Sequence, residues 1–319
     1  MFELLAKQEL KTVPLNFAIC QDKGIKLSLI QTSFMHPLAS GNKLFKLAAN
    51  IDAVRKSQEY SKILSFGGPY SNHLHALAQV THADGIECIA VVRGYPVYGS
   101  NPTLSVLSEL GVKIIWVDKR TYRRRYDVDY LAELQQLYPD ALIVPEGGTN
   151  AKALLGCQQL GHMINALDSD IDTVVLPCGT GGTLAGLATS LSKQTRLLAY
   201  DVVGDNTTPR RVAELIAQPD AAATYQIRQT QTSYGTLNQR LIKFICDFID
   251  QTNILLDPLY TSVVCQKLFD DIHSGAIQHN THLAILHTGG LQGWYGMKNS
   301  FIKQTNEQYW QEYIISNLS

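Results

Sequence analysis

Hydrophobic positions alternate between two periods along most of the chain. Short apolar runs, typical of strands that are buried on both faces, occur at residues 26–30, 62–66, 88–92, 113–117, 141–145, 173–177, 197–203 and 283–287. Between them, apolar residues recur at helical spacing at residues 43–56, 71–82, 104–111, 129–138, 150–167 and 182–193. Such alternation predicts βαβ units, so we expect an α/β fold of open parallel sheets with helices on both faces.

Composition narrows the class of protein. A length of 319 residues predicts two domains or one large α/β domain. The 27 Lys and Arg residues nearly balance the 28 Asp and Glu residues, which argues against nucleic acid or an anionic membrane as a partner. Because the charges balance, the basic run Arg123–Arg125 is interpreted as a solvated helix start rather than a nucleic-acid patch.

Cysteine spacing and the N-terminal sequence bear on the cellular compartment. The six cysteines are scattered without a CxxC pair, which indicates neither a zinc ribbon nor a redox motif. The first residues lack the basic and apolar regions of a signal peptide, and no apolar run approaches the length of about 20 residues that spans a membrane. We therefore expect a cytoplasmic protein.

Glycine-rich turns follow four of the predicted strands. They are SFGGPYSNH (65–73), VPEGGTN (144–150), LPCGTGGTLAG (176–186) and LHTGGLQG (286–293). In open parallel sheets, ligands bind at the carboxyl ends of the strands, where these turns lie. The third turn runs through Gly179, Thr180, Gly181 and Gly182 into a helix that Thr183 opens. Backbone N–H groups and threonine hydroxyls in such a turn predict a phosphate site.

Other interpretations of these turns remain open or are disfavoured. A Walker loop would need Gly-Lys-Ser/Thr, which is absent. A dinucleotide fingerprint would need glycine where Leu184 stands, although Asp201 at the end of the next strand could bind a ribose, so an NAD-dependent oxidoreductase stays an alternative. His73 and His75 are two positions apart, on different faces of a helix, and no HExxH occurs, so we expect no metal site.

Two lysines in SGNKLFKL (40–47) call for a separate explanation. A solvated helix face explains Lys43 and Lys46, which are three residues apart. It does not explain why Lys43 stands at the start of the helix, behind a flexible glycine and an asparagine that can cap the helix. Lys43 is therefore a candidate nucleophile.

The motifs SGNKLFKL, SFGGPYSNH, VPEGGTN, PCGTGGTLAG, LDPLYTS and HTGG, in this order, resemble the D-cysteine desulfhydrase and 1-aminocyclopropane-1-carboxylate deaminase family. The likeness extends from about residue 36 to residue 293. It implies the tryptophan synthase β-like fold (fold type II) with pyridoxal 5'-phosphate between two domains. We expect residues 48–145 to form a smaller α/β domain, and residues 1–47 and 146–319 a larger cofactor-binding domain. The resemblance implies a small amino acid as the substrate, and we expect a homodimer.

The resemblance assigns cofactor residues by position. Lys43 matches the lysine that binds the cofactor aldehyde as a Schiff base, Lys46 matches a lysine near the phosphate, and Asn72 matches the residue that bonds the ring hydroxyl. The turn from Gly179 to Thr183 matches the phosphate cradle. As a free amine, the Schiff-base lysine can also move protons.

Substrate residues are implied in the same way. Ser71 matches the active-site serine at the substrate, and Tyr234 and Tyr260 match two active-site tyrosines. The turn that contains Ser71 can offer backbone N–H groups to the substrate carboxylate.

Thr261 and Thr288 bear on the reaction. Thr261 matches the residue that faces the pyridine nitrogen, and a hydroxyl there cannot keep this nitrogen protonated as a carboxylate would. Deaminases of the family carry an acid and a leucine at these two positions, so the pair of threonines favours the desulfhydrase type. We expect a lyase that removes a β-leaving group, with D-cysteine converted to pyruvate, sulfide and ammonia.

Two further hypotheses remain as alternatives to the lyase. The first is 1-aminocyclopropane-1-carboxylate deaminase, which opens the ring by hydrolysis to 2-oxobutanoate and ammonia. The second is a family member that binds the cofactor but has no activity. Gln31 and Thr32 motivate it, because the family usually carries charged residues on this strand.

Overall fold

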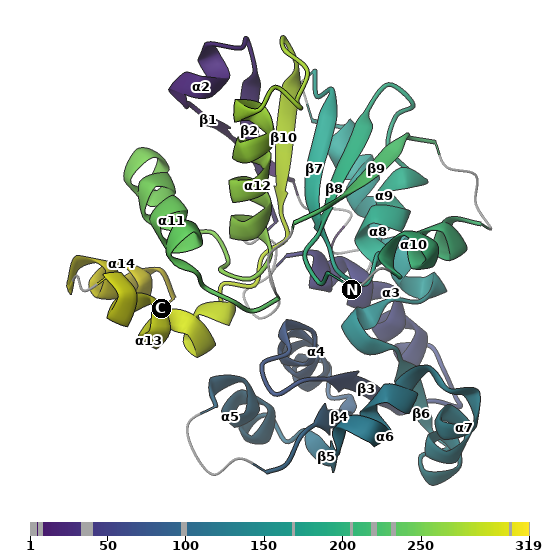
Figure 1. The fold of residues 1–319 in the computed structure, drawn as a ribbon. Coiled ribbons are helices and arrows are strands. Elements are labelled where there is room, and N and C mark those ends of the chain that lie inside the picture. The colour runs from purple at the N-terminus through teal and green to yellow at the C-terminus, as the bar shows by residue number, and fades with distance from the viewer. Residues whose placement is uncertain are drawn as a thin grey trace.

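The computed structural model describes residue 5 and residues 9–32, 41–96, 101–167, 170–204, 207–217, 222–230, 234–305 and 308–318. In these residues the strands form two separate sheets (Figure 1). The strands are β1 (Lys11–Leu15), β2 (Lys26–Gln31), β3 (Lys62–Gly67), β4 (Glu87–Arg93), β5 (Lys113–Val117), β6 (Ala141–Val144), β7 (Thr173–Cys178), β8 (Arg196–Asp201), β9 (Tyr225–Gln229) and β10 (His282–His287).

Helices connect these strands and pack against the sheets. They are α2 (Ala18–Gln21), α3 (Asn42–Arg55), α4 (Asn72–Ala83), α5 (Pro102–Glu109), α6 (Lys119–Arg123), α7 (Val128–Leu137), α8 (Ala151–Asn165), α9 (Gly182–Ala188), α10 (Thr208–Ile216), α11 (Gln239–Thr252), α12 (Thr261–His273), α13 (Gly293–Thr305) and α14 (Gln308–Leu318). Two 3-10 turns, η1 (Arg124–Tyr126) and η2 (Glu146–Gly148), complete the set. None of the helices in the described ranges is both long and apolar enough to cross a membrane.

The larger sheet has the order β1-β2-β10-β7-β8-β9, and all its pairs are parallel except β1 with β2. Its centre is a row of buried side chains, because Leu29, Ile285 and Val175 are register partners across β2, β10 and β7. The smaller sheet has the order β5-β4-β3-β6 and is entirely parallel. The expected α/β fold with two open, mostly parallel sheets is therefore confirmed.

All eight predicted strands are present, each within two residues of its expected ends. The strands β1 and β9 escaped prediction because both lie at an edge of the larger sheet and are largely exposed. Edge strands with one covered side do not show the continuous apolar run of a central strand. The smaller sheet lies within the predicted domain 48–145, but the boundary at 47/48 falls inside α3. The domain boundaries themselves stay a prediction.

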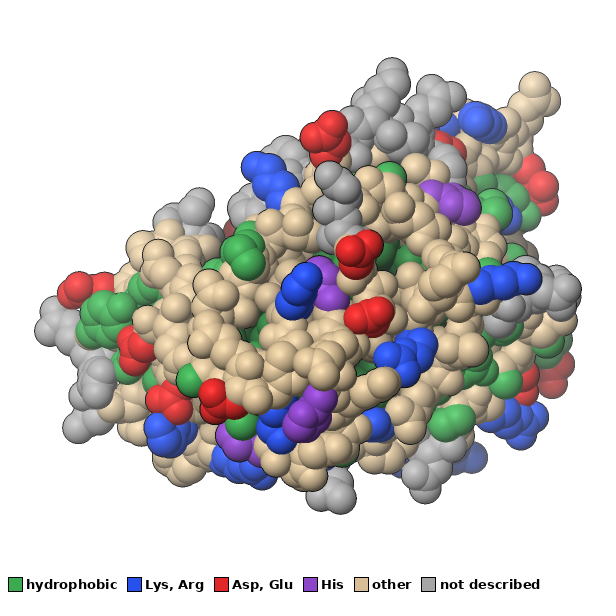
Figure 2. Space-filling model, turned by 90° about the horizontal axis from the view of Figure 1, so that it is seen from above, with side chains coloured by type: hydrophobic (Ala, Val, Ile, Leu, Met, Phe, Trp, Pro, Cys, Tyr) green, Lys and Arg blue, Asp and Glu red, His purple; other side chains and the backbone are tan. Residues whose placement is uncertain are grey.

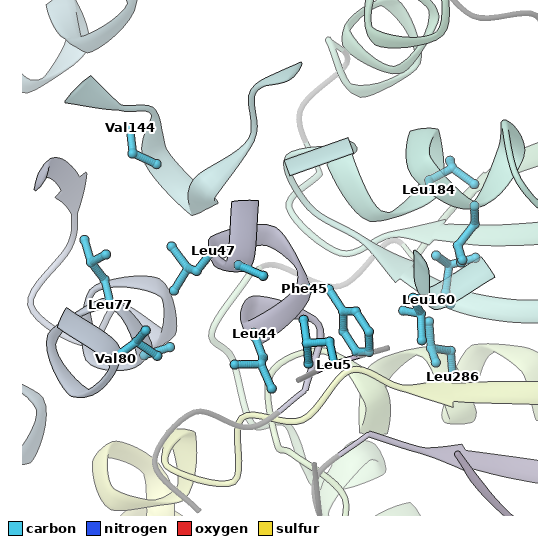
Figure 3. Close-up of a cluster of buried hydrophobic side chains, with 14 of the residues drawn as sticks. Leu5, Leu44, Phe45, Leu47, Leu77, Val80, Val144, Leu160, Leu184 and Leu286 are labelled. Carbon is cyan, nitrogen blue, oxygen red and sulfur yellow. The ribbon is translucent and has the colours of Figure 1, made fainter. Parts of the chain in front are cut away.

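Helix α3 is covered on two opposite sides by hydrophobic side chains (Figure 3). Its Leu44 and Leu47 lie toward side chains of the smaller sheet and of α4, namely Leu77, Val80 and Val144. Phe45 points the other way, toward Leu160, Leu184 and Leu286 of α8, α9 and β10. One contiguous core therefore runs through α3 and joins the two sheets.

Charges of both signs are interspersed on the outer surface. Figure 2 shows the molecule from above the view of Figure 1, and Lys and Arg side chains alternate on that face with Asp and Glu side chains. This distribution agrees with the formal net charge of −1.

Substitution of Gly156 tests the contact between α3 and α8. A Cβ atom at Gly156 would lie 1.8 Å from the backbone oxygen of Phe45, which cannot move without shifting α3. We expect Gly156→Ala to lower the free energy of unfolding by about 1–3 kcal/mol or more, measured by urea denaturation. Leu155→Ala is the control on the same helix, because Leu155 is 53% exposed, and its effect should stay within about 0.5 kcal/mol. Equal effects of the two substitutions would show that the backbone contact is unimportant.

Candidate active site

A cavity of about 760 Å3 lies between the two sheets, at the carboxyl ends of their strands. Its walls come from the turns after β3, β4, β5 and β6 of the smaller sheet and after β7, β8 and β10 of the larger one. Of the predicted site residues, those that line it are Lys43, Lys46, Ser71, Asn72, Gly179, Thr180, Gly181, Thr183, Tyr234, Tyr260 and Thr288. Gly182 and Thr261 are not among the lining residues. The structure thus brings most of the predicted site together.

The turn before α3 fixes where Lys43 stands. Gly41 has a φ of 74°, and a Cβ atom there would lie 1.8 Å from the backbone oxygen of Thr288, so only glycine fits. Asn42 donates its backbone N–H to the same Thr288 oxygen over 3.0 Å and its side-chain amide to Thr183 Oγ1 over 2.9 Å. The start of α3 is thereby tied to β10 and to α9. Ser40, the first residue of the predicted turn, lies outside the described residues.

Lys43 has the surroundings of a reactive amine. Its Nζ donates to Asn42 Oδ1 over 3.0 Å and lies 5.9 Å from the centre of the Tyr260 ring. Burial, together with the nearby Lys46 ammonium, lowers the pKa of Lys43 from 10.5 to about 7. A large fraction of the amine is therefore neutral at physiological pH, and the neutral amine is the nucleophilic form.

Lys46 carries a buried charge that no described carboxylate neutralises. Its Nζ donates to Gly147 O, Thr149 Oγ1 and Thr180 Oγ1 over 3.0, 2.8 and 3.0 Å, which uses all three N–H bonds of the ammonium. All three acceptors are neutral, and burial lowers the pKa of Lys46. A buried cation without a counter-ion is costly, so a bound anion at this place would stabilise the protein.

The turn after β7 leaves room for such an anion. Gly181 has a φ of 87°, a conformation that favours glycine. A Cβ atom at Gly179 would meet nothing closer than Val203 at 3.7 Å, so the backbone here is open to the cavity. Thr183 also lines the cavity, where its Oγ1 accepts the side-chain amide of Asn42 and its hydroxyl faces the Cys157 thiol.

The start of α4 forms the opposite wall. Ser71 caps the helix, and its Oγ accepts the backbone N–H of Leu74 over 3.2 Å. Ser71, Asn72 and His73 all line the cavity, and the first N–H groups of a helix have no acceptor within it. These groups suit a carboxylate.

His73 is held neutral beside the two lysines. Burial first, then the charges of Lys43 and Lys46, lower its pKa from 6.5 to about 3. Its Nε2 lies 2.7 Å from Ser65 Oγ, which donates to Val144 O over 2.7 Å, so we assign the ring proton to Nε2. Nδ1 then has no partner among the described residues. In those residues no group of three or more His, Cys, Asp or Glu side chains could hold a metal ion.

The two predicted tyrosines form a pair. The hydroxyls of Tyr234 and Tyr260 lie 2.9 Å apart, and the buried carboxylate of Asp257 positions Tyr260 by accepting its backbone N–H over 2.7 Å. Burial, and then the neighbouring Tyr234, raise the pKa of Tyr260 well above its usual value. Both phenols therefore keep their protons at neutral pH.

Two predicted roles have no support in the position of the side chains. Thr261 is fully buried, donates its backbone N–H to Asp257 over 2.9 Å and does not line the cavity, so its contact with a cofactor ring stays a prediction. Asp201 accepts the backbone N–H groups of Val203 and Gly204, both over 3.0 Å, which occupies the carboxylate in its own turn. The ribose-binding interpretation of Asp201 is therefore disfavoured.

Basic side chains that were not among the predicted site residues also line this cavity: Arg93, Lys119, Arg123, Arg125 and Arg211. The run Arg123–Arg125 was interpreted as a solvated helix start, but Arg123 and Arg125 face the cavity, and Arg125 pairs there with Glu146. The signal was present for Arg93, because it ends β4 and the carboxyl ends of parallel strands were already expected to hold the site. The only carboxylate among the described lining residues is Glu146.

The residues present fit pyridoxal phosphate. A buried amine with a pKa near neutrality suits an aldehyde, and it shares the cavity with Lys46 and an open glycine turn that suit a phosphate. The same cavity of about 760 Å3 is lined by Ser71 and the tyrosine pair, so these groups share it with the proposed cofactor residues.

Comparison with known proteins gives consistent results. The chain is 24% identical over 320 residues to a putative 1-aminocyclopropane-1-carboxylate deaminase of Thermotoga maritima, covering 92% of this chain and 98% of the relative. It is 28% identical over 286 residues to a D-cysteine desulfhydrase of Klebsiella pneumoniae strain 342, covering 80% of this chain and 84% of the relative. Both names belong to the family that the motifs indicated.

Solved structures share the fold. The crystal structure of an ACC deaminase homologue matches with a TM-score of 0.78 at 23% identity, covering 95% of this chain and 98% of that chain. O-ureido-L-serine synthase matches with a TM-score of 0.70 at 14% identity, covering 94% of each chain. The expected fold type II architecture is thereby confirmed. The profile of the family described as pyridoxal-phosphate dependent enzyme matches residues 21–289, and the chain belongs to this family.

Proposed function

We propose that this chain is a pyridoxal-phosphate-dependent lyase that removes a β-leaving group from a small amino acid, with D-cysteine converted to pyruvate, sulfide and ammonia. The observation that carries the proposal is the position of Lys43 at the start of α3, where its partly buried amine lines the cavity and donates to Asn42 Oδ1 over 3.0 Å. Its lowered pKa of about 7 suits it to bind an aldehyde and to exchange protons near neutral pH. When bound, the cofactor supplies an electron sink at the substrate Cα.

The phosphate is held, on this proposal, by the turn from Gly179 to Thr183 together with Lys46. The glycines allow close approach of the backbone, and the helix α9 begins at this turn with its first N–H groups directed toward the cavity side of the sheet. The bound phosphate would neutralise the Lys46 ammonium, which has only neutral partners in the protein.

The substrate then lies between α4 and the tyrosine pair. We expect the N–H groups at the start of α4 and the Ser71 hydroxyl to hold its carboxylate. We assign to Lys43 the removal of the proton from Cα, because its pKa of about 7 suits both taking and giving a proton near neutral pH. Tyr260 and Tyr234 keep their protons at neutral pH and can donate one to the departing sulfur.

A second candidate function is 1-aminocyclopropane-1-carboxylate deaminase, which the name of the Thermotoga maritima relative favours. Opening a carbon–carbon bond asks for a stronger electron sink than expelling a thiolate, and a carboxylate at the pyridine nitrogen would supply it. Glu146 accepts from Tyr122 and Arg125, both over 2.6 Å, and is thus already engaged. The lining residues that the structure describes therefore favour elimination. We also propose that two copies form a homodimer.

Covalent labelling tests the role of Lys43. Borohydride reduction of the cofactor-loaded protein should attach the cofactor to the peptide that contains Lys43, and Lys43→Ala should show no attachment. Because the neutral amine reacts, capture of the cofactor by the apoprotein should rise with pH through a midpoint near 7 rather than near 10.5. Mass spectrometry of the peptides and stopped-flow absorbance measure the two effects. Attachment at Lys46 would refute the assignment.

Ser71→Ala separates the capping role of Ser71 from its role at the substrate. Loss of the bond to Leu74 should cost about 0.5–2 kcal/mol of stability, whereas turnover should fall about 100-fold or more if the hydroxyl acts on the substrate. Asn238→Ala is the matched control, because Asn238 caps α11 through Leu241 in the same way and does not line the cavity. Thermal unfolding and turnover are measured for both variants. Near-normal turnover of Ser71→Ala would show that Ser71 acts only as the cap of α4.

The choice between the two reactions is tested directly on the wild-type protein. With D-cysteine we expect equal release of sulfide, pyruvate and ammonia, and with 1-aminocyclopropane-1-carboxylate we expect at least about 10-fold less 2-oxobutanoate at the same substrate concentration. Heat-treated protein and Lys43→Ala serve as controls. Efficient ring-opening without sulfide release would reverse the assignment.

A further inference from the structure

The cavity is strongly basic although the chain as a whole is nearly neutral. Lys43, Lys46, Arg93, Lys119, Arg123, Arg125 and Arg211 line it, against the single carboxylate of Glu146. The whole chain has a net charge of −1. Walls of one sign focus the field into a cleft and select a ligand of the opposite sign.

Several of these cations already have a function. Lys43 and Lys46 belong to the proposed cofactor site, and Arg211 donates to Gly179 O over 3.3 Å at the phosphate turn. Arg125 forms an ion pair with Glu146 at 2.6 Å. The start of α4 suits the α-carboxylate of the substrate without any cation. Three cations of the smaller-sheet wall remain: Arg93, Lys119 and Arg123.

Arg93 is the best placed of these three. It forms no ion pair with any described carboxylate, and its Nη2 lies 3.6 Å from where a Cβ atom of Gly68 would stand. The guanidinium is therefore next to the turn that leads to Ser71, at the substrate end of the cavity.

Aromatic contacts hold Arg93 in this place. Its Cζ lies 5.7 Å from the centre of the Tyr122 ring, and Arg125 contacts the same ring at 4.7 Å. Tyr122 is fixed in turn, because its hydroxyl donates to Glu146 over 2.6 Å. Tyr234 lines the same cavity as Arg93. A planar guanidinium fixed on a ring is well suited to bind a carboxylate, sulfonate or phosphate through two hydrogen bonds.

We propose that the site selects amino acids whose side chain carries a second negative charge, and that Arg93 binds this charge. The inference rests on the proposed function and names the substrate class of the same cavity. D-Cysteine carries this charge only as its thiolate, a minor form at neutral pH. On this inference it is therefore turned over more weakly than an amino acid with a sulfonate or phosphate as its β-leaving group, and aspartate serves as a non-reacting anionic probe. Lys119 and Arg123 add to the positive electrostatic potential of the cavity, but neither is held against an aromatic ring as Arg93 is.

Matched pairs of amino acids test the selection. Cofactor-loaded wild-type protein is titrated with aspartate and asparagine, and with O-phosphoserine and serine, each as both enantiomers, and dissociation constants are taken from the change in cofactor absorbance. In each pair and for at least one enantiomer, the anionic member should bind about 10-fold tighter or more. This ratio should shrink as ionic strength rises, since the guanidinium is exposed to solvent.

Variants of Arg93 assign the effect to that residue. Arg93→Gln should bring the ratio within each pair to about 3 or less, and Arg93→Lys should restore part of it. Arg120→Gln is the matched control, because Arg120 is an exposed arginine of α6 that does not line the cavity, and it should leave the ratio unchanged. Cofactor content and borohydride attachment to Lys43 are measured for every variant.

The outcomes separate the inference from the proposed function. Equal affinities within the pairs, with the cofactor attached to Lys43, would overturn the inference and leave the proposed function standing. If Arg93→Gln weakens the binding of both members of a pair equally, Arg93 binds the α-carboxylate instead. If the variant loses only affinity for the cofactor, Arg93 acts in cofactor capture. Either result overturns the inference. A wild-type protein that never attaches the cofactor would refute both.

Discussion

Helix α3 is buried on two opposite sides, and the position of the reactive groups depends on this burial. Leu44 and Leu47 pack toward the smaller sheet, and Phe45 packs toward the larger one. Lys43 and Lys46 alternate with these residues on the first turns, so the packing that joins the two sheets also fixes both lysines. At Gly156 the backbones of α3 and α8 are in direct contact, which leaves no freedom to shift the helix along its neighbour.

The same burial accounts for the chemistry of the site. Removing an ammonium group from water disfavours its charged form, and two such groups three residues apart disfavour it further. The structure resolves this conflict differently for the two lysines. Lys46 is surrounded by three oxygen acceptors that support its charge, whereas Lys43 has one amide oxygen and a pKa of about 7. Burial lowers the pKa of both lysines, and they differ in that Lys46 is held by three acceptors whereas Lys43 has one.

The features that could be predicted from the sequence are those whose signal lies within a few consecutive residues. The central strands were predictable because they are buried on both faces and appear as continuous apolar runs, whereas the exposed edge strands β1 and β9 were not. The glycine turns located the cavity, since parallel strands end on one side of a sheet. The place of Thr261 was not predictable, because the buried Asp257 carboxylate folds the preceding turn and directs the start of α12. Arg93 was missed because a single arginine after a strand resembles an ordinary surface residue.

The order of strands has a consequence for biosynthesis. The smaller sheet is built from β3 to β6, which follow one another in the chain, so it can assemble as soon as these residues leave the ribosome. The larger sheet cannot, because β2, near the N-terminus, has β10, near the C-terminus, as its parallel neighbour. Until β10 is made, the mostly buried strand β2 keeps one edge open, and unpaired edges of this kind tend to associate with other chains. Native pairing of the larger sheet is thus one of the last events in the synthesis of the folded part of the chain, whereas the smaller sheet can be complete long before it.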